Sequence, residues 1–162
     1  SSRRQQASPG SPLADAATLA ALAEASVRQG VRILRAEGSA AIRAIHEATG
    51  ASLICIVKRD YPGSEVRITA TALEVEELVE LPCDVIAMDA TARARPGLQE
   101  LGALVARAHA GGLLVMGDCD DLASMELAVA AGVDMVGSTL AGYTGAPSTQ
   151  RRGLEGPALE LV

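Results

Sequence analysis

Aromatic side chains are almost absent from this sequence: its 162 residues include no Phe, no Trp and only two Tyr. The core must therefore be built from Ala, Val, Leu, Ile and Met, and few aromatic platforms are available for stacking nucleic-acid bases. The net charge of −6 also argues against a surface that attracts a polyanion. We therefore expect no nucleic-acid partner.

Cysteine is scarce as well, and long apolar runs are missing. Cys55, Cys83 and Cys119 are odd in number, far apart and without CxxC spacing, which favours reduced thiols in a cytoplasmic protein over a zinc or other metal site. No window is long enough to cross a bilayer, and the basic start "SSRRQQASPG" lacks the apolar centre of a signal peptide. We expect a cytoplasmic protein with no membrane partner.

Nucleotide-binding and hydrolase motifs are absent too, because no GxGxxG, GxxxxGK or GxSxG pattern occurs. What is present is an alternation of β-rich runs with stretches of helical spacing, which predicts an α/β fold with a parallel sheet covered by helices. The predicted strands are 31–34, 52–57, 84–88, 113–117 and 134–140, and the predicted helices are 13–30, 39–50, 71–81, 98–112 and 121–132. A sixth strand could precede the first helix. By length alone a doubly wound sheet fits, whereas a closed barrel typically needs at least about 200 residues.

Local signals predict how some of these helices begin and end. Ser39 is a candidate N-cap for the second helix, and Gly50 is a common type of helix stop. Asp120 or Asp121 is a natural cap for the last predicted helix.

Four predicted strands end in a strongly polar residue: Arg35, Lys58, Asp89 and Asp118. In parallel α/β folds ligands bind at this edge of the sheet, so the four side chains could converge on one pocket. Each also has an ordinary explanation. Lys58 could be a solvated strand end, Asp118 a helix cap and Asp89 an Asx turn. Arg35 could pair with Glu37 or with a helix carboxylate.

Lys58 is the only lysine, whereas the other thirteen basic residues are arginine. Arginine cannot lose its proton at ordinary pH, but a lysine in an apolar pocket or near another cation can become a neutral base. The composition favours arginine, so a site that keeps lysine indicates a need for a removable proton. We therefore predict proton transfer or Schiff-base chemistry at Lys58.

Several stretches resemble the N-acylglucosamine-6-phosphate 2-epimerases, also called N-acetylmannosamine-6-phosphate 2-epimerases. The matching stretches are "IVKRDYPGSEVRITAT" (56–71), "DVIAMDATARARP" (84–96), "VDMVGSTLAGYTG" (133–145) and, more loosely, "QASPGSPL" (6–13) and "RILRAEG" (32–38). The resemblance implies a (β/α)8 TIM-barrel fold of the ribulose-phosphate-binding kind, acting in bacterial sialic acid and amino-sugar breakdown. It implies that residues 1–162 form a single partial barrel domain of about six βα units, without the last two strands.

The resemblance also implies roles for individual residues. Lys58 would be the catalytic residue that moves the proton at C2 of an amino-sugar phosphate, and Asp118 would also be catalytic, orienting the substrate together with Arg35. The remaining implied substrate-binding residues are Gln6, Asp89, Tyr143 and Thr144. The reaction requires no metal or organic cofactor, and a homodimer is compatible with the family.

Departures from the family pattern leave alternatives. The first strand should be apolar, yet residues 1–5 read "SSRRQ". In the family the last two strands carry a second catalytic Glu and the phosphate loops, and Glu155 here does not correspond to that Glu. The chain could therefore be an inactive barrel remnant that binds sugar phosphate weakly or serves only as an interaction partner. An aldolase that forms a Schiff base on Lys58 is a further alternative.

Overall fold

The computed structural model describes residues 2–5 and 15–144, in which six parallel strands pair in chain order from β1 to β6. The strands are β1 (Ser2–Gln5), β2 (Ile33–Glu37), β3 (Ser52–Ile56), β4 (Val85–Asp89), β5 (Leu114–Asp118) and β6 (Met135–Gly137). All five strands expected from apolar runs are confirmed, with bounds that differ by at most three residues. β1 is the sixth strand expected before the first helix, although its sequence is polar.

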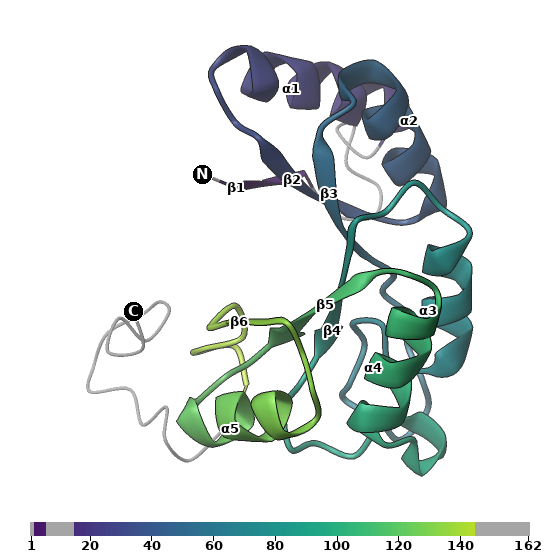
Figure 1. The fold of residues 1–162 in the computed structure, drawn as a ribbon, viewed down its shortest axis with the longest axis vertical. Coiled ribbons are helices and arrows are strands. Elements are labelled where there is room, and N and C mark those ends of the chain that lie inside the picture. The colour runs from purple at the N-terminus through teal and green to yellow at the C-terminus, as the bar shows by residue number, and fades with distance from the viewer. Residues whose placement is uncertain (1, 6–14, 145–162) are drawn as a thin grey trace.

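Five α-helices alternate with these strands. They are α1 (Ala16–Arg28), α2 (Ser39–Thr49), α3 (Ala72–Val79), α4 (Leu101–Ala110) and α5 (Leu122–Ala130), and a 3₁₀ turn, η1 (Pro96–Leu98), precedes α4. Figure 1 shows the strands on the concave side of an arc and the helices on its convex side. Within the described ranges, no helix is long and apolar enough to cross a membrane.

The doubly wound sheet expected from length alone is wrong. Such a sheet reverses its strand order at a switch point and carries helices on both faces. Here the order is sequential and the helices cover one side, as in an arc of a (β/α) barrel. The barrel type implied by the family resemblance is therefore confirmed.

Side chains alternate between the two faces of the sheet and build two separate apolar clusters. On the outer face, strand residues such as Leu34, Leu53 and Ile86 pack with helix residues such as Ile42 and Leu78. The inner-face cluster is smaller and contains Ile54, Ile56, Val85 and Ala87, with Ile68, Met116 and Met135 packed against it. Polar groups at the carboxyl ends of the same inner rows therefore lie next to an apolar floor.

The helix-end predictions are partly right. Asp121 caps α5 by accepting a hydrogen bond from the Ser124 amide at 2.8 Å, and Gly50 ends α2 in the left-handed region at φ 57°. Ser39, however, is not the cap of α2. Gly38 occupies that position with φ 80°, a conformation that favours glycine, and the Ser39 hydroxyl donates to Glu77 instead.

Candidate active site at the carboxyl edge of the sheet

A hollow of about 240 Å³ lies at the carboxyl edge of the sheet. Its lining comprises Arg35, Ile56, Lys58, Ile68, Asp118, Thr139, Leu140 and Tyr143. Four of the residues predicted for the site, namely Arg35, Lys58, Asp118 and Tyr143, therefore share one hollow. Asp118 ends β5, Lys58 follows β3 and Tyr143 lies in the loop after β6, whereas Arg35, expected at a strand end, lies in the middle of β2.

Arg35 and Asp118 form a buried, two-point ion pair across this hollow. Arg35 Nη1 donates to Asp118 Oδ1 at 2.8 Å, and Nη2 donates to Oδ2. Asp118 is fully buried, and the Thr139 hydroxyl donates to its Oδ1 at 2.7 Å. Asp118 is thus not a cap of α5, and Arg35 pairs with neither Glu37 nor a helix carboxylate. Among the described residues, Arg35 Nε has no hydrogen-bond partner.

Lys58 pairs with Glu37, which was expected as a partner of Arg35 instead. Its Nζ lies 2.9 Å from Glu37 Oε2, and both side chains are about one-third exposed (33% and 29%). Ile56 and Ile68 supply the expected apolar wall beside Lys58. The amine therefore faces the same hollow as the Arg35–Asp118 pair and has a carboxylate of its own.

The returning strand of the loop after β3 holds Lys58 in place. β3 and β4 pair at only two positions, after which Ile68 and Thr69 lie between them. The Thr69 amide donates to the Val57 carbonyl at 2.9 Å, and the Asp89 amide donates to the Ile68 carbonyl at 3.0 Å. The buried Thr69 adopts φ 45°, which is unusual for a β-branched residue, and its hydroxyl donates to the Ala87 carbonyl at 2.8 Å. The loop thus ties together the ends of both strands.

Two predicted substrate-binding residues that the structure describes, Asp89 and Thr144, are not among those that line the hollow. The Asp89 carboxylate accepts hydrogen bonds from the Thr91 amide and hydroxyl and from Arg93, which is the Asx-turn arrangement considered from the sequence. The Thr144 hydroxyl donates to Asp120 at 2.5 Å. Gln6 lies outside the described residues.

Glu37 and Thr139 were missed as parts of the site. Glu37 follows Arg35 by two positions, so alternation along β2 places both on the inner face, and this signal could have identified it. Thr139 lies in a loop after β6, where no strand periodicity applies. Its contact with Asp118 depends on the path of that loop.

Cys119 lies beside Asp118 but is unsuited to act as a nucleophile. Burial, followed by the neighbouring carboxylates Asp118 and Asp120, raises the pKa of its thiol to about 12. The thiol therefore stays protonated at neutral pH, and the reactive thiolate does not form. In the part of the chain that the structure describes, no group of three or more His, Cys, Asp or Glu side chains could hold a metal ion.

Sequence comparison places residues 19–161 within the profile of a family described as "NanE: Putative N-acetylmannosamine-6-phosphate epimerase". The chain is 43% identical over 141 residues to a protein of Enterobacter sp. (strain 638), covering 86% of this chain and 60% of that protein. It is 38% identical over 157 residues to a protein of Clostridioides difficile (strain 630), covering 97% and 69%. Both relatives are named "Putative N-acetylmannosamine-6-phosphate 2-epimerase". The chain spans about three fifths of the length of several such relatives.

Solved structures agree with this assignment. The N-acetylmannosamine-6-phosphate 2-epimerase from Clostridium perfringens superposes with a TM-score of 0.87 at 38% identity, covering 89% of this chain and 63% of that one. A multifunctional pyruvate carboxylase from Rhizobium etli, at 18% identity, superposes with a TM-score of 0.56 over 83% of this chain and 14% of its own. The second likeness shows a shared fold alone.

Proposed function

Since this chain belongs to the N-acetylmannosamine-6-phosphate epimerase family, we propose that its hollow serves the interconversion of N-acetylmannosamine 6-phosphate and N-acetylglucosamine 6-phosphate. The two sugars differ only in configuration at C2. The reaction belongs to amino-sugar and sialic acid breakdown, and we place it in the bacterial cytoplasm. The observation that carries the proposal is that Lys58 and the Arg35–Asp118 pair line one hollow at the carboxyl edge of the sheet.

The chemistry begins with the ring-opened sugar, in which C2 is adjacent to an aldehyde. Lys58 acts as the base that removes the C2 proton, and the electron pair of the C–H bond moves to the carbonyl oxygen to give an enolate. A solvent proton added to the opposite face of C2 re-forms the aldehyde and inverts the centre, and Lys58 releases the proton it took to solvent. Glu37, 2.9 Å from Nζ, stabilises the ammonium ion formed in the first step.

The enolate oxygen needs fixed positive charge, which we assign to Arg35. A preorganised donor in a buried site stabilises developing charge without reorganisation. Asp118 holds the guanidinium by two contacts, and Thr139 holds Asp118. We therefore propose that Asp118 positions Arg35. This is a more limited role than the catalytic one predicted for Asp118 from the sequence.

Tyr143 is the remaining lining residue of the hollow that the sequence predicts to bind substrate. Tyr143, whose side chain is exposed at the edge of the hollow, is proposed to contact the sugar. Gln6, Asp89 and Thr144 stay predicted substrate-binding residues. We further propose that residues 1–162 form one domain, an arc of a barrel, that the protein forms a homodimer and that the reaction needs no metal or organic cofactor.

Exchange of hydrogen with solvent tests the proposal directly. The chain is incubated with N-acetylmannosamine 6-phosphate in deuterium oxide, and deuterium at C2 is measured by NMR. We expect incorporation with the unaltered chain and with Arg32→Met, because Arg32 is exposed and lies outside the hollow. We expect none with Lys58→Met. Equal exchange by Lys58→Met, or no exchange by the unaltered chain, would contradict the proposal.

A further inference from the structure

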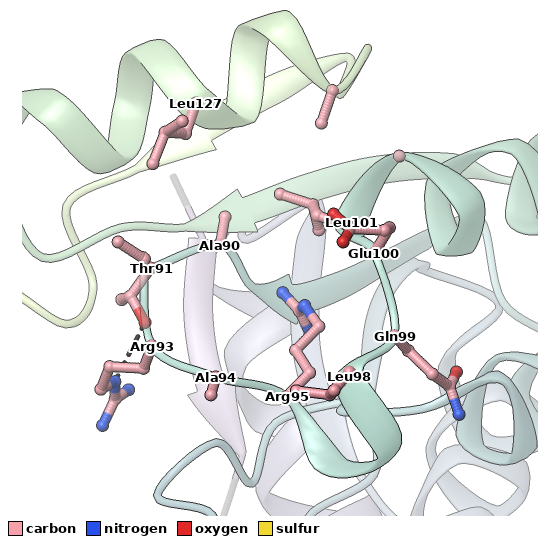
Figure 2. Close-up of a pocket in the computed structure, with 13 residues that line it drawn as sticks. Ala90, Thr91, Arg93, Ala94, Arg95, Leu98, Gln99, Glu100, Leu101 and Leu127 are labelled. Atoms are coloured by element: carbon pink, nitrogen blue, oxygen red, sulfur yellow. Dashed lines mark hydrogen bonds between the residues drawn. The ribbon is translucent and has the colours of Figure 1, made fainter.

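A second hollow, of about 370 Å³, lies on the helical side of the fold and shares no lining residue with the first. It is formed by the loop after β4, the first turn of α4 and residues Leu127 and Ala131 of α5 and its C-cap. Figure 2 shows these residues as a ring, with the side chain of Arg95 extending from the loop into its centre. Nothing in the proposed epimerase chemistry uses this hollow.

Arg95 is the unusual residue of the ring. It is only 7% exposed, and neither of its terminal nitrogens, Nη1 or Nη2, has a hydrogen-bond partner among the described residues. Arg93, two positions earlier, is different because its guanidinium binds Asp89 and Thr91. A buried guanidinium whose terminal nitrogens make no hydrogen bond is costly, since these groups have lost water without gaining an acceptor in its place. The same arrangement becomes favourable when an anion enters the hollow.

The start of α4 adds a second source of positive potential. Its N-cap residue, Glu100, makes no side-chain capping bond, so no side chain at that position satisfies the first amides of the helix. Leu101 and Gly102 line the hollow, and Gly102 has no side chain to block access to the first turn. An added Cβ there would have only the Ala131 carbonyl oxygen within 4 Å, at 3.8 Å. Helix N-termini of this kind attract anions.

We propose that this hollow is a binding site for the phosphate group of a small molecule, with Arg95 as the two-point donor and the first turn of α4 as the second donor. A phosphate has more acceptor oxygens than a carboxylate, so it can meet both donor sets together. Glu100 is exposed and lines the hollow, and no ion pair joins it to Arg95. The site is separate from the hollow in which the sugar reacts.

Inorganic phosphate is the probe, and its position is read from amide chemical shifts of the ¹⁵N-labelled chain. We expect shifts concentrated in residues 90–102 and at Ala131, together with a rise in melting temperature that saturates with phosphate. Shifts confined to the surroundings of Lys58, or the absence of any saturable shift, would overturn the proposal. Acetate at equal concentration distinguishes a phosphate site from a general anion site. Equal chemical-shift changes with acetate would also overturn the proposal.

Arg95→Met is the decisive variant, and Arg32→Met is its matched control for the loss of one positive charge. Without phosphate, we expect Arg95→Met to melt no lower than the unaltered chain, because the variant removes a buried guanidinium whose terminal nitrogens make no hydrogen bond to the described residues. We expect its phosphate affinity to fall at least tenfold, while Arg32→Met keeps full affinity. An unchanged affinity in Arg95→Met would overturn the proposal. If Arg95→Met does not fold, Arg95→Lys replaces it, and the same tenfold weakening is expected because lysine lacks the two-point fork.

Glu100→Gln tests the other explanation, that Glu100 is the true partner of Arg95 in solution. Under our proposal, phosphate affinity stays the same or rises in this variant, because a negative charge near the ligand is removed. The melting temperature also stays unchanged in phosphate-free buffer. A clear loss of thermal stability in Glu100→Gln would show that the carboxylate already pairs with Arg95, and the proposal would fall.

Discussion

Arg35 and Asp118 lie 83 positions apart in the chain, and their side chains meet in a buried two-point ion pair with an Nη1–Oδ1 distance of 2.8 Å. The pair joins the middle of β2 to the end of β5, and these two strands are separated in the sheet by β3 and β4. It therefore spans the inner face of the arc and fixes the guanidinium before any substrate arrives. Fold stability and site geometry depend on the same contact.

The first prediction concerns the removal of one member of this pair. Arg35→Met leaves the Asp118 carboxylate buried without its counter-ion, so we expect a loss of about 3–5 kcal/mol in the free energy of unfolding. Urea denaturation of the variant measures it. The double variant Arg35→Met/Asp118→Leu should recover a large part of the loss, because no charge remains buried. A double variant less stable than Arg35→Met would contradict this account.

The second prediction separates charge from proton transfer at Lys58. Lys58→Arg keeps a cation beside Glu37 but cannot give up a proton at ordinary pH. We expect exchange at C2 to fall by about 10²–10⁴-fold, with a melting temperature close to that of the unaltered chain. Borohydride treatment in the presence of substrate is the complementary measurement. A covalent sugar adduct at Lys58 would favour the Schiff-base alternative and contradict simple proton transfer.

The third prediction is a pH dependence of stability that arises at Glu74. Burial raises the pKa of this carboxyl, but hydrogen bonds from Thr71 and Tyr61 and the charge of Arg59 outweigh burial, so the net pKa lies below the ordinary 4.5. Because the pKa of Glu74 is lower in the folded state than in the unfolded state, its contribution to the free energy of unfolding is complete above about pH 4.5. It is lost as the pH falls below 4.5 through the folded-state pKa.

Denaturation from about pH 7 to about pH 3 measures this loss. Glu74→Gln should cost about 1.5–3 kcal/mol at neutral pH, because bonds to a charged group are replaced by weaker ones. It should also flatten the acid limb of the curve. Glu24→Gln is the matched control, since Glu24 is half-buried on α1 and its one ion pair among the described residues is an i,i+4 pair with Arg28. An acid limb of equal slope in both variants would exclude Glu74 as its source.

The fourth prediction concerns Thr69, whose hydroxyl binds the Ala87 carbonyl from a positive-φ conformation. Thr69→Val keeps the shape and removes the donor, so we expect a loss of about 1–3 kcal/mol. Thr69→Ser keeps the hydroxyl and should lose less. Unfolding free energies of both variants give the comparison. Equal losses would show that the methyl group, and not the hydrogen bond, matters at this position.

The alternation of strands and helices was predictable because each element has a signal in its own short stretch of sequence. The apolar runs of β3 and β4 and the helical spacing of α2 and α5 lie within ten or so residues of chain. Strand order is different, since it depends on contacts between distant segments. Length alone therefore favoured a doubly wound sheet, and only the family resemblance indicated a barrel.

The candidate site was predictable to a similar depth. The polar ends of three predicted strands identified Arg35, Lys58 and Asp118, because parallel strands bring those ends to one edge. Pairing among them was not predictable. Whether Glu37 meets Arg35 or Lys58 depends on rotamers and on the path of the loop after β3, and neither leaves a periodic signal in the sequence.

The insertion of Ile68 and Thr69 between β3 and β4 has a consequence for anyone who re-engineers this region. The tip of the loop, with its turn at Tyr61–Ser64, cannot simply be shortened, because the Tyr61 hydroxyl donates to Glu74 and the Ser64 hydroxyl donates to the Ala94 carbonyl. The Ile68–Thr69 dipeptide cannot be moved into another loop without its surroundings, since its backbone bonds to both strands and sets the distance between their ends. A chimera that moves it by a single position would displace Lys58 and Asp89 together, and would lose the geometry of the edge while keeping every residue on it.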